Sequence, residues 1–219
     1  MGKVMITGGG TGLGRALAHR YAKAGHTIYL LGRTENQLSL VVKEISENGG
    51  TAESIICDVT EPASVDEAVR QMDELDILIN NAGVGYFGNL SSLTTSQLEN
   101  MLDTNVKGTI LMTKAAVPFL IKANGRVLNI ISTAGLRGKV NEAAYCASKF
   151  AVRGFTESLQ KEWAETGITA TAVYMGGMNT PFWDNSDHVT DPDRLKHPEV
   201  VAEHIFQEDD GREQIKVDS

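Results

Sequence analysis

Apolar runs of strand length alternate with helical patterns along the whole chain. The strand-length runs cover residues 3–7, 27–32, 52–57, 75–80, 126–131 and 168–174, with a last one near 213–217. Apolar residues recur at helical spacing in the segments 11–24, 35–47, 62–72, 95–122, 143–165 and 198–207. Strands that alternate with helix-length connections predict a parallel sheet with helices on both faces. We therefore expect a single α/β domain over residues 1–219, a Rossmann-type doubly wound sheet of about seven strands.

Two segments depart from this regular pattern. Pro118 lies inside the helical segment 95–122, where we expect a kink because proline lacks an N–H group and clashes with the preceding turn. Residues 176–198 are weakly patterned and rich in loop-forming residues. We expect a loop-rich connection there.

The composition excludes several classes of protein. Of the 219 residues, 42% are hydrophobic and 22% are charged, as in ordinary globular domains. The net charge of −8 is unlike the basic surface of a nucleic-acid-binding protein and would be repelled by anionic lipid. No apolar run approaches the roughly 18 residues of a membrane-spanning helix. Cys57 and Cys146 cannot form a disulfide framework, so we expect a cytoplasmic protein without nucleic-acid or membrane partners.

A glycine-rich run follows the first predicted strand, at the edge where doubly wound sheets bind ligands. Its residues are Thr7, Gly8, Gly9, Gly10, Thr11, Gly12, Leu13 and Gly14, and a helix follows. Glycines let the backbone approach a pyrophosphate, and the helix N-terminus supplies free N–H groups. The run does not contain a strict G-x-G-x-x-G motif, so a tight turn without a ligand is the alternative.

The end of the second predicted strand bears on the type of nucleotide. Dinucleotide sites that bind NAD carry an acidic residue there, which accepts from the ribose 2′-hydroxyl group. This chain has Arg33 at that place and no acid. Because a guanidinium group pairs with a phosphate through two hydrogen bonds, Arg33 favours NADP(H) over NAD(H). The alternative is a solvated surface arginine.

Ser132, Tyr145 and Lys149 form a candidate catalytic set. Tyr145 and Lys149 are four residues apart in a predicted helix and therefore share one face. An ammonium group near a phenol favours the phenolate, so we expect Lys149 to lower the pKa of Tyr145 and make it a general acid/base. Ser132, at the end of the fifth predicted strand, is placed to hold a substrate carbonyl group.

Taken together, these motifs resemble those of the short-chain dehydrogenase/reductase family over nearly the whole chain. Besides the glycine run, the matches are Asp58 after the third strand, the run Asn80-Asn81-Ala82-Gly83 after the fourth, and Asn105. Ser132, Tyr145 and Lys149 match the rest of the family's catalytic tetrad in order and spacing. The chain departs from the family pattern at Met175, where the family has proline before Gly176, and its segment before the last helix is short.

The resemblance implies a role for each matching position. Tyr145 exchanges a proton with a carbonyl or alcohol oxygen, Ser132 binds that oxygen, and Lys149 holds the nicotinamide ribose. Asn105 supports a proton relay from Lys149 to solvent. The positions assigned to the cofactor are Thr7, Gly8, Gly10, Thr11, Gly12, Leu13, Gly14, Arg33, Asp58, Val59, Asn81, Ala82, Gly83, Tyr145, Lys149, Gly176 and Thr180.

The resemblance leaves three functions to separate. The leading one is an NADP(H)-dependent oxidoreductase that interconverts a ketone or aldehyde with an alcohol. The second is a reductase of ketoacyl groups on a carrier protein, and the third is a catalytically silent protein that senses NADP(H). The resemblance also implies a homodimer or homotetramer assembled through residues 95–122 and 143–165. The five histidines show no metal-ligand spacing, so we expect no metal.

Overall fold

All seven strands of the sheet run parallel, in the order β3-β2-β1-β4-β5-β6-β7. The computed structural model describes residues 2–184, 186 and 188–217. Its strands are β1 (Lys3–Thr7), β2 (Thr27–Gly32), β3 (Thr51–Ile56), β4 (Ile77–Asn80), β5 (Arg126–Ile130), β6 (Thr169–Tyr174) and β7 (Gln214–Lys216). The strand order reverses between β1 and β4, which is where ligands bind in such sheets. The predicted doubly wound architecture is confirmed.

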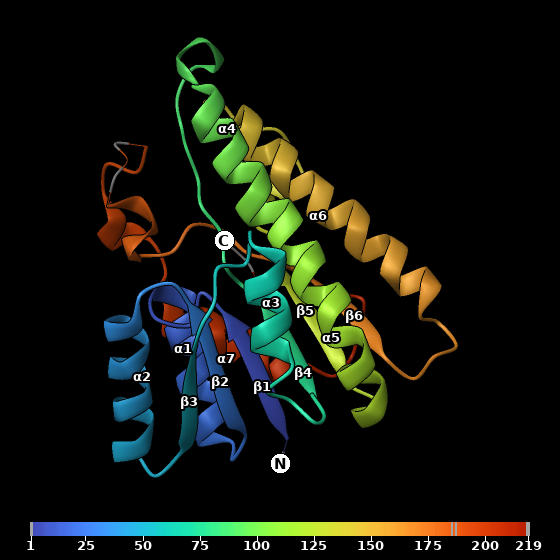
Figure 1. Cartoon of the computed structure of the whole chain (residues 1–219). Helices are drawn as coiled ribbons and strands as arrows, with labels where there is room; N and C mark the ends of the chain where they lie inside the picture. Colours follow the sequence, from blue (N-terminus) through green and yellow to red (C-terminus); the bar gives the residue numbers. More distant parts are fainter. Residues whose placement is uncertain (1, 185, 187, 218–219) are drawn as a thin grey trace.

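Helices cover both faces of the sheet (Figure 1). One layer consists of α1 (Gly12–Lys23), α2 (Glu35–Glu47) and α7 (Pro198–Glu208). The other consists of α3 (Pro62–Val69), α5 (Thr109–Ala123) and α6 (Ala143–Glu162), with α4 (Thr95–Met101) extending α5 beyond the sheet. Within the described residues, we find no helix that combines the length and the apolar character needed to cross a bilayer.

The central strands β1, β4 and β5 are largely apolar and buried because each of their faces packs against helices. In β1, Val4 and Ile6 belong to the core beneath α1, α2 and α7, whereas Met5 belongs to the core beneath α3 and α5. Side chains alternate between the two faces of a strand, so a strand covered on both sides reads as one apolar run. The carboxyl ends of the strands are thereby fixed as a rigid edge.

The helical segment predicted over 95–122 is not one α-helix. A π-helical stretch, Leu102–Gly108, separates α4 from α5, and α5 continues through Pro118. The main departure from α-helical geometry is thus the π stretch and not Pro118, which lies on the exposed side of α5. Such stretches occur often at functional sites, and this one contains Asn105.

A partly buried ion pair joins several elements near the start of β5, at the amino-terminal ends of the strands. The Asp209 carboxylate, after α7, accepts hydrogen bonds from Arg126 at 2.5 and 2.8 Å and from the Tyr21 hydroxyl group at 2.5 Å. Burial and the neighbouring carboxylate raise the pKa of Tyr21 above its ordinary value. These contacts hold α1, β5 and the end of α7 together beneath the ligand-binding edge.

Candidate active site

Glycines allow the loop after β1 to fold tightly against the start of α1. Gly8 and Gly12 have φ values of +64° and +51°, a region that favours glycine. A Cβ atom on Gly14 would lie 2.2 Å from the Gly8 carbonyl oxygen, so a larger residue does not fit there. The loop therefore presents a bare backbone at a helix N-terminus, an arrangement suited to binding phosphate groups.

Thr7 and Asn81 tie this loop to the end of β4. The Thr7 hydroxyl group accepts hydrogen bonds from the backbone N–H groups of Asn81 and Ala82, both at 3.0 Å. The Asn81 side-chain amide donates to the carbonyl oxygens of Thr7 at 3.0 Å and of Gly8 at 3.2 Å. The side chains of Thr7 and Asn81 therefore form hydrogen bonds with backbone groups of the two loops, and these bonds hold the glycine loop against the end of β4.

A cavity of about 180 Å³ lies beside the loop, over the ends of β2 and β3. Arg33 and Asp58 line it at these two strand ends. On the side of the glycine loop, the cavity is lined by Gly8 and Gly10. These residues have no side chain, so a nucleotide can approach their backbone closely. The cavity therefore fits the adenosine end of a dinucleotide. Its lining includes the predicted positions Gly8, Gly10, Thr11, Arg33, Asp58, Val59, Ala82 and Gly83.

Asp58 is held in its ionised form. Its carboxylate accepts hydrogen bonds from the Thr60 backbone N–H at 3.0 Å and from the Thr60 hydroxyl group at 2.8 Å. Burial alone would raise the pKa of Asp58, but these hydrogen bonds and the charges of Arg33 and Lys107 outweigh it. The pKa of Asp58 therefore lies below its usual value, and a fixed acceptor faces Arg33 across the cavity.

Ser132 stands at the end of β5 in an unusual backbone conformation. Its φ of +104° is rare for a residue with a side chain, and its hydroxyl oxygen accepts a hydrogen bond from the Ala134 backbone N–H at 3.2 Å. Strained conformations of this kind are retained where the surrounding structure enforces them, often at active sites. Ser132 lines the same cavity as Tyr145, and its hydroxyl group acts to lower the pKa of that tyrosine.

Burial governs the protonation of Tyr145 and Lys149. Both side chains lie in α6 and are less than a tenth exposed. Burial raises the pKa of Tyr145 above its ordinary range, and the hydrogen bond with Ser132 offsets only part of this effect. Burial also lowers the pKa of Lys149 to about 8. The net pKa of Tyr145 is thus raised, opposite to the direction expected from a neighbouring ammonium group alone, because desolvation of the phenolate dominates.

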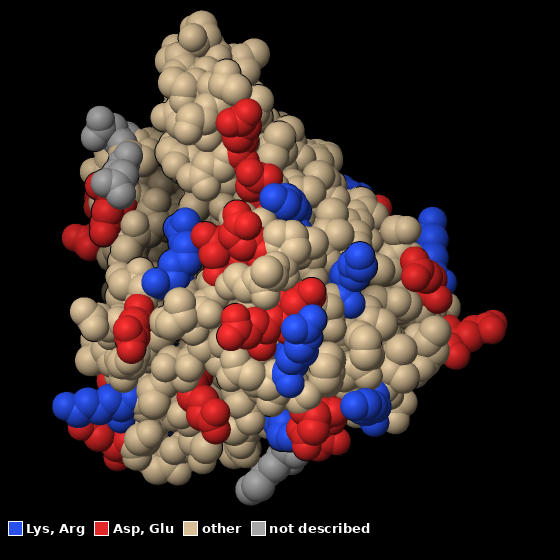
Figure 2. All heavy atoms as spheres, in the orientation of Figure 1, with Lys and Arg blue, Asp and Glu red and all other residues tan. Residues whose placement is uncertain are grey.

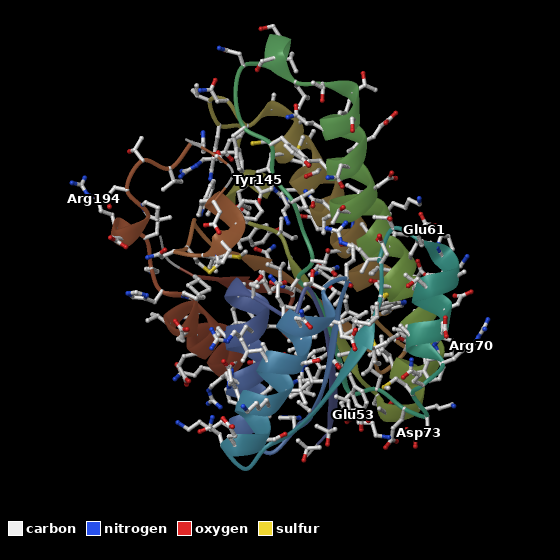
Figure 3. All side chains as sticks on the ribbon, turned by 60° about the vertical axis from the view of Figure 1, so that its left-hand side comes forward. Glu53, Glu61, Arg70, Asp73, Tyr145 and Arg194 are labelled. Carbon is white, nitrogen blue, oxygen red and sulfur yellow. The ribbon has the colours of Figure 1, made fainter. Side chains whose placement is uncertain are left out.

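The position of the Lys149 ammonium group is consistent with this result. Its Nζ atom donates a hydrogen bond to the Ile130 carbonyl oxygen at 3.0 Å and lies 5.7 Å from the centre of the Tyr145 ring. Figure 3 shows Tyr145 beyond the edge of the sheet that is remote from Glu53 and Asp73. The phenol thus remains neutral at physiological pH, as a proton donor requires.

Asn105 lies behind this pair in the π-helical stretch and is fully buried. Its side-chain amide donates to the Val84 carbonyl oxygen at 2.9 Å and to the Ser148 hydroxyl group at 3.0 Å. Its side-chain oxygen accepts from the Val84 backbone N–H at 2.8 Å. The Ser148 hydroxyl group in turn donates to the Tyr145 carbonyl oxygen at 2.7 Å. Asn105 therefore connects the loop after β4 to the helix that carries Tyr145 and Lys149.

One cavity of about 610 Å³ joins the glycine loop to the candidate catalytic residues. Thr180 closes its near side against the loop, since a Cβ atom on Gly12 would lie 3.2 Å from the Cβ atom of Thr180. The predicted positions that line this cavity are Gly8, Thr11, Gly12, Leu13, Asn81, Ala82, Gly83, Ser132, Tyr145, Lys149, Gly176 and Thr180. Thr7, Gly14 and Asn105 line neither cavity and act as supports.

Sequence reasoning missed several residues on the far side of this cavity. Phe182 and Trp183 form an apolar part of its lining. Glu142 and His188 line it as well, and Phe87 packs behind them. No local motif marks these residues, because loop segments distant in the chain bring them together.

Comparisons with known proteins agree with this geometry. The family model for short chain dehydrogenase matches residues 2–190. The chain is 38% identical over 184 residues to a putative ketoacyl reductase of the monensin polyketide synthase from Streptomyces virginiae, covering 81% of this chain and 70% of that protein. It is 34% identical over 188 residues to a 3beta-hydroxysteroid dehydrogenase from Mediterraneibacter gnavus, and this match covers 84% of this chain and 68% of that protein.

The chain belongs to the short-chain dehydrogenase family.

A solved structure supports the same assignment. A variant of actinorhodin polyketide ketoreductase with NADPH superposes with a TM-score of 0.87 at 29% identity, covering 99% of this chain and 95% of that one. As a short-chain dehydrogenase, the protein is an oxidoreductase that acts on CH–OH groups. The comparisons leave its substrate and its preference between NADP(H) and NAD(H) open.

Two glycine-to-alanine substitutions should have opposite effects on stability. Gly154→Ala, in the middle of α6 where nothing lies within 4 Å of the added Cβ atom, should raise the free energy of unfolding by about 0.5–1 kcal/mol. Gly14→Ala should lower it by about 1–3 kcal/mol, because the loop backbone must move. Urea denaturation measures both changes, and a stabilising Gly14→Ala would contradict the close packing of the loop.

Proposed function

We propose that the protein interconverts a ketone or aldehyde with the corresponding alcohol, using NADP(H) and Tyr145 as general acid/base. The observation that carries the proposal is the continuous cavity in which the glycine loop meets Ser132, Tyr145 and Lys149. The bare loop backbone and the Arg33 cavity are suited to a dinucleotide, and a related solved structure was determined with NADPH. When bound, the nicotinamide cofactor supplies or accepts the hydride at the carbonyl carbon.

In the direction of reduction, the protein's own residues position the carbonyl and supply the proton. Ser132 donates a hydrogen bond to the carbonyl oxygen and holds it beside the Tyr145 hydroxyl group. Tyr145 transfers its proton to that oxygen as negative charge develops there. Its raised pKa keeps this proton in place before reaction. Lys149, with a pKa of about 8, is poised to return a proton to Tyr145, and Asn105 fixes the helix on which both residues lie.

The reductase of carrier-bound ketoacyl groups is a second candidate function. It is favoured by the description of the Streptomyces virginiae relative as a putative ketoacyl reductase. Carrier proteins are acidic and this chain has a net charge of −8, so electrostatic repulsion would slow their association. Figure 2 shows acidic and basic side chains interspersed over the face it presents. Faster reduction of a carrier-bound ketoacyl group than of the same group as a free thioester would favour this second function.

Removing the Tyr145 hydroxyl group should abolish turnover and spare cofactor binding. We expect Tyr145→Phe to lower kcat/KM for ketone reduction by about 100-fold or more, since a positioned proton donor contributes that much. The Kd for NADPH, measured by fluorescence titration, should be unchanged.

Tyr174→Phe is the matched control, because Tyr174 is also buried and its hydroxyl group has no hydrogen-bond partner among the described residues. This variant should keep wild-type kinetics. Full activity in Tyr145→Phe would exclude Tyr145 as the proton donor, and a wild type that binds NADPH but reduces no ketone would favour the silent binding protein.

Arg33 should decide the preference between the two nicotinamide cofactors. We expect Arg33→Ala to weaken NADPH binding by about tenfold or more, because the 2′-phosphate loses a charge-assisted pair, and to leave NADH binding nearly unchanged. Arg70→Ala is the control, because Arg70 is an exposed arginine directly after α3 that does not line the cavity (Figure 3). An unaltered ratio of the two Kd values in Arg33→Ala would contradict the assignment.

We also propose that the protein is cytoplasmic and assembles as a homodimer or homotetramer. Cys57 and Cys146 are free thiols, consistent with a reducing compartment. Large apolar side chains are exposed on the helices expected to form the interface, namely Leu102, Ile110, Ile121 and Phe150.

Sedimentation at micromolar protein concentration should give the mass of two or four chains, because these apolar side chains would then be covered. A mass of one chain throughout would contradict the proposed assembly.

A further inference from the structure

Tyr145 shares the far side of the larger cavity with a wall of aromatic rings. The Phe87 and Phe182 ring centroids lie 5.3 and 6.0 Å from that of Tyr145. Trp183 packs against both, at 5.1 Å from Phe87 and 5.0 Å from Phe182. The rings come from the loop after β4 and the segment after β6, so they meet only in the folded protein. An apolar surface built of tilted and edge-to-face rings beside the candidate proton donor favours an apolar substrate with an aromatic ring, which can add further contacts of the same kind.

His188 completes this wall and gives it a polar edge. Its ring stacks on Phe87 at 4.7 Å with only 14° between the planes, and lies 6.1 Å from Trp183. Its Nε2 atom lies 3.0 Å from Oε1 of Glu142. One side of the imidazole ring therefore extends the apolar wall, and its edge forms a hydrogen bond.

Glu142 is a buried carboxylate that the proposed chemistry does not use. It is 7% exposed and precedes Tyr145 by three residues at the start of α6, so its position relative to the phenol is fixed. The Lys139 ammonium group lies 3.9 Å from its Oε2 atom. A carboxylate has about four acceptor positions, and burying one is costly unless they are filled. The contacts with His188 and Lys139 leave room for a further hydrogen-bond donor from the cavity.

Building on the oxidoreductase function proposed above, we propose that this wall and the Glu142–His188 pair select a flat, apolar carbonyl compound that bears a hydroxyl group away from its carbonyl. The imidazole N–H that faces Glu142 is used within the pair, whereas the carboxylate keeps open acceptor positions, so a substrate hydroxyl group matches Glu142 as a donor. A carboxylate on the substrate would be repelled by Glu142. A cationic group would compete with Lys139, whose charge already offsets that of Glu142.

The Glu142–His188 pair thus determines specificity. Its effect is measurable as the ratio of kcat/KM for a hydroxylated ketone to kcat/KM for the same ketone without the hydroxyl group. A site built to bind a substrate hydroxyl group discriminates against the analogue that lacks it, since the buried polar groups are then left unpaired. Acetophenone and 4-hydroxyacetophenone form a suitable pair of probes. We expect wild-type protein with NADPH to show a kcat/KM at least about tenfold higher for the hydroxylated ketone.

Two variants should reduce this ratio. His188→Phe keeps a flat ring against Phe87 but cannot bond to Glu142, so the ratio should fall toward one. Glu142→Gln keeps the shape but accepts more weakly, so the ratio should fall several-fold. The matched controls are Glu157→Gln, which alters a carboxylate paired with Arg153 on the same helix, and His197→Phe, which alters an exposed histidine. Both controls should keep the wild-type ratio.

Calorimetric binding of both ketones to the NADP⁺-loaded protein separates this inference from the proposed function. Equal kcat/KM values in the wild type, or a ratio unaffected by both His188→Phe and Glu142→Gln, would overturn the inference and leave the function intact. If neither ketone is reduced, the proposed function fails and binding alone decides the inference. Tighter binding of 4-hydroxyacetophenone would then support it, and equal or undetectable binding would overturn it.

Discussion

The burial of Tyr145 and Lys149 against the ends of the central strands is the constraint on which the site depends. Removal from water disfavours the charged form of each group, so the phenol stays neutral and the pKa of the lysine falls to about 8. In the proposed reaction, this leaves Tyr145 with a proton to donate and Lys149 able to replace it. The strained backbone of Ser132 and the buried Asn105 amide keep both groups in place.

The same strand ends explain why the two halves of the site meet. Thr7 and Asn81 join the ends of β1 and β4, where the strand order reverses, and the glycine loop folds over that junction. The next strand in the sheet, β5, ends at Ile130, two residues before Ser132. Strand order therefore places the glycine loop beside Ser132, as the proposed transfer between a nucleotide at the loop and a carbonyl group at Ser132 would require.

The sequence predicted the parts of the fold and site that depend on local pattern. Alternating apolar runs gave the seven parallel strands, and the short motifs marked Ser132, Tyr145 and Lys149, which the structure brings into one cavity. The π-helical stretch around Asn105 was not predictable, because a short π turn shifts the apolar pattern of the surrounding α-helix by only about one residue. The direction of the Tyr145 pKa was missed for a related reason. Spacing places a lysine near a tyrosine but says nothing about how deeply both are buried.

The substrate side was the least predictable region. Phe87, Glu142 and His188 are separated by dozens of residues and meet only because loops after β4 and β6 close over α6. The contacts of these residues with one another cannot be predicted from the spacing of apolar residues along the chain. The proposed substrate specificity therefore depends on the tertiary arrangement of loops, whereas the proposed cofactor positions follow local motifs.

The protonation state of Tyr145 tests the central claim most directly. An ultraviolet titration of the wild type, from which the titration of Tyr145→Phe is subtracted, isolates the phenolate signal of this one tyrosine. A neutral, buried proton donor predicts no phenolate from Tyr145 below about pH 10, the ordinary pKa of tyrosine. A phenolate that forms near neutral pH would contradict the claim and show that the charge of Lys149 outweighs burial.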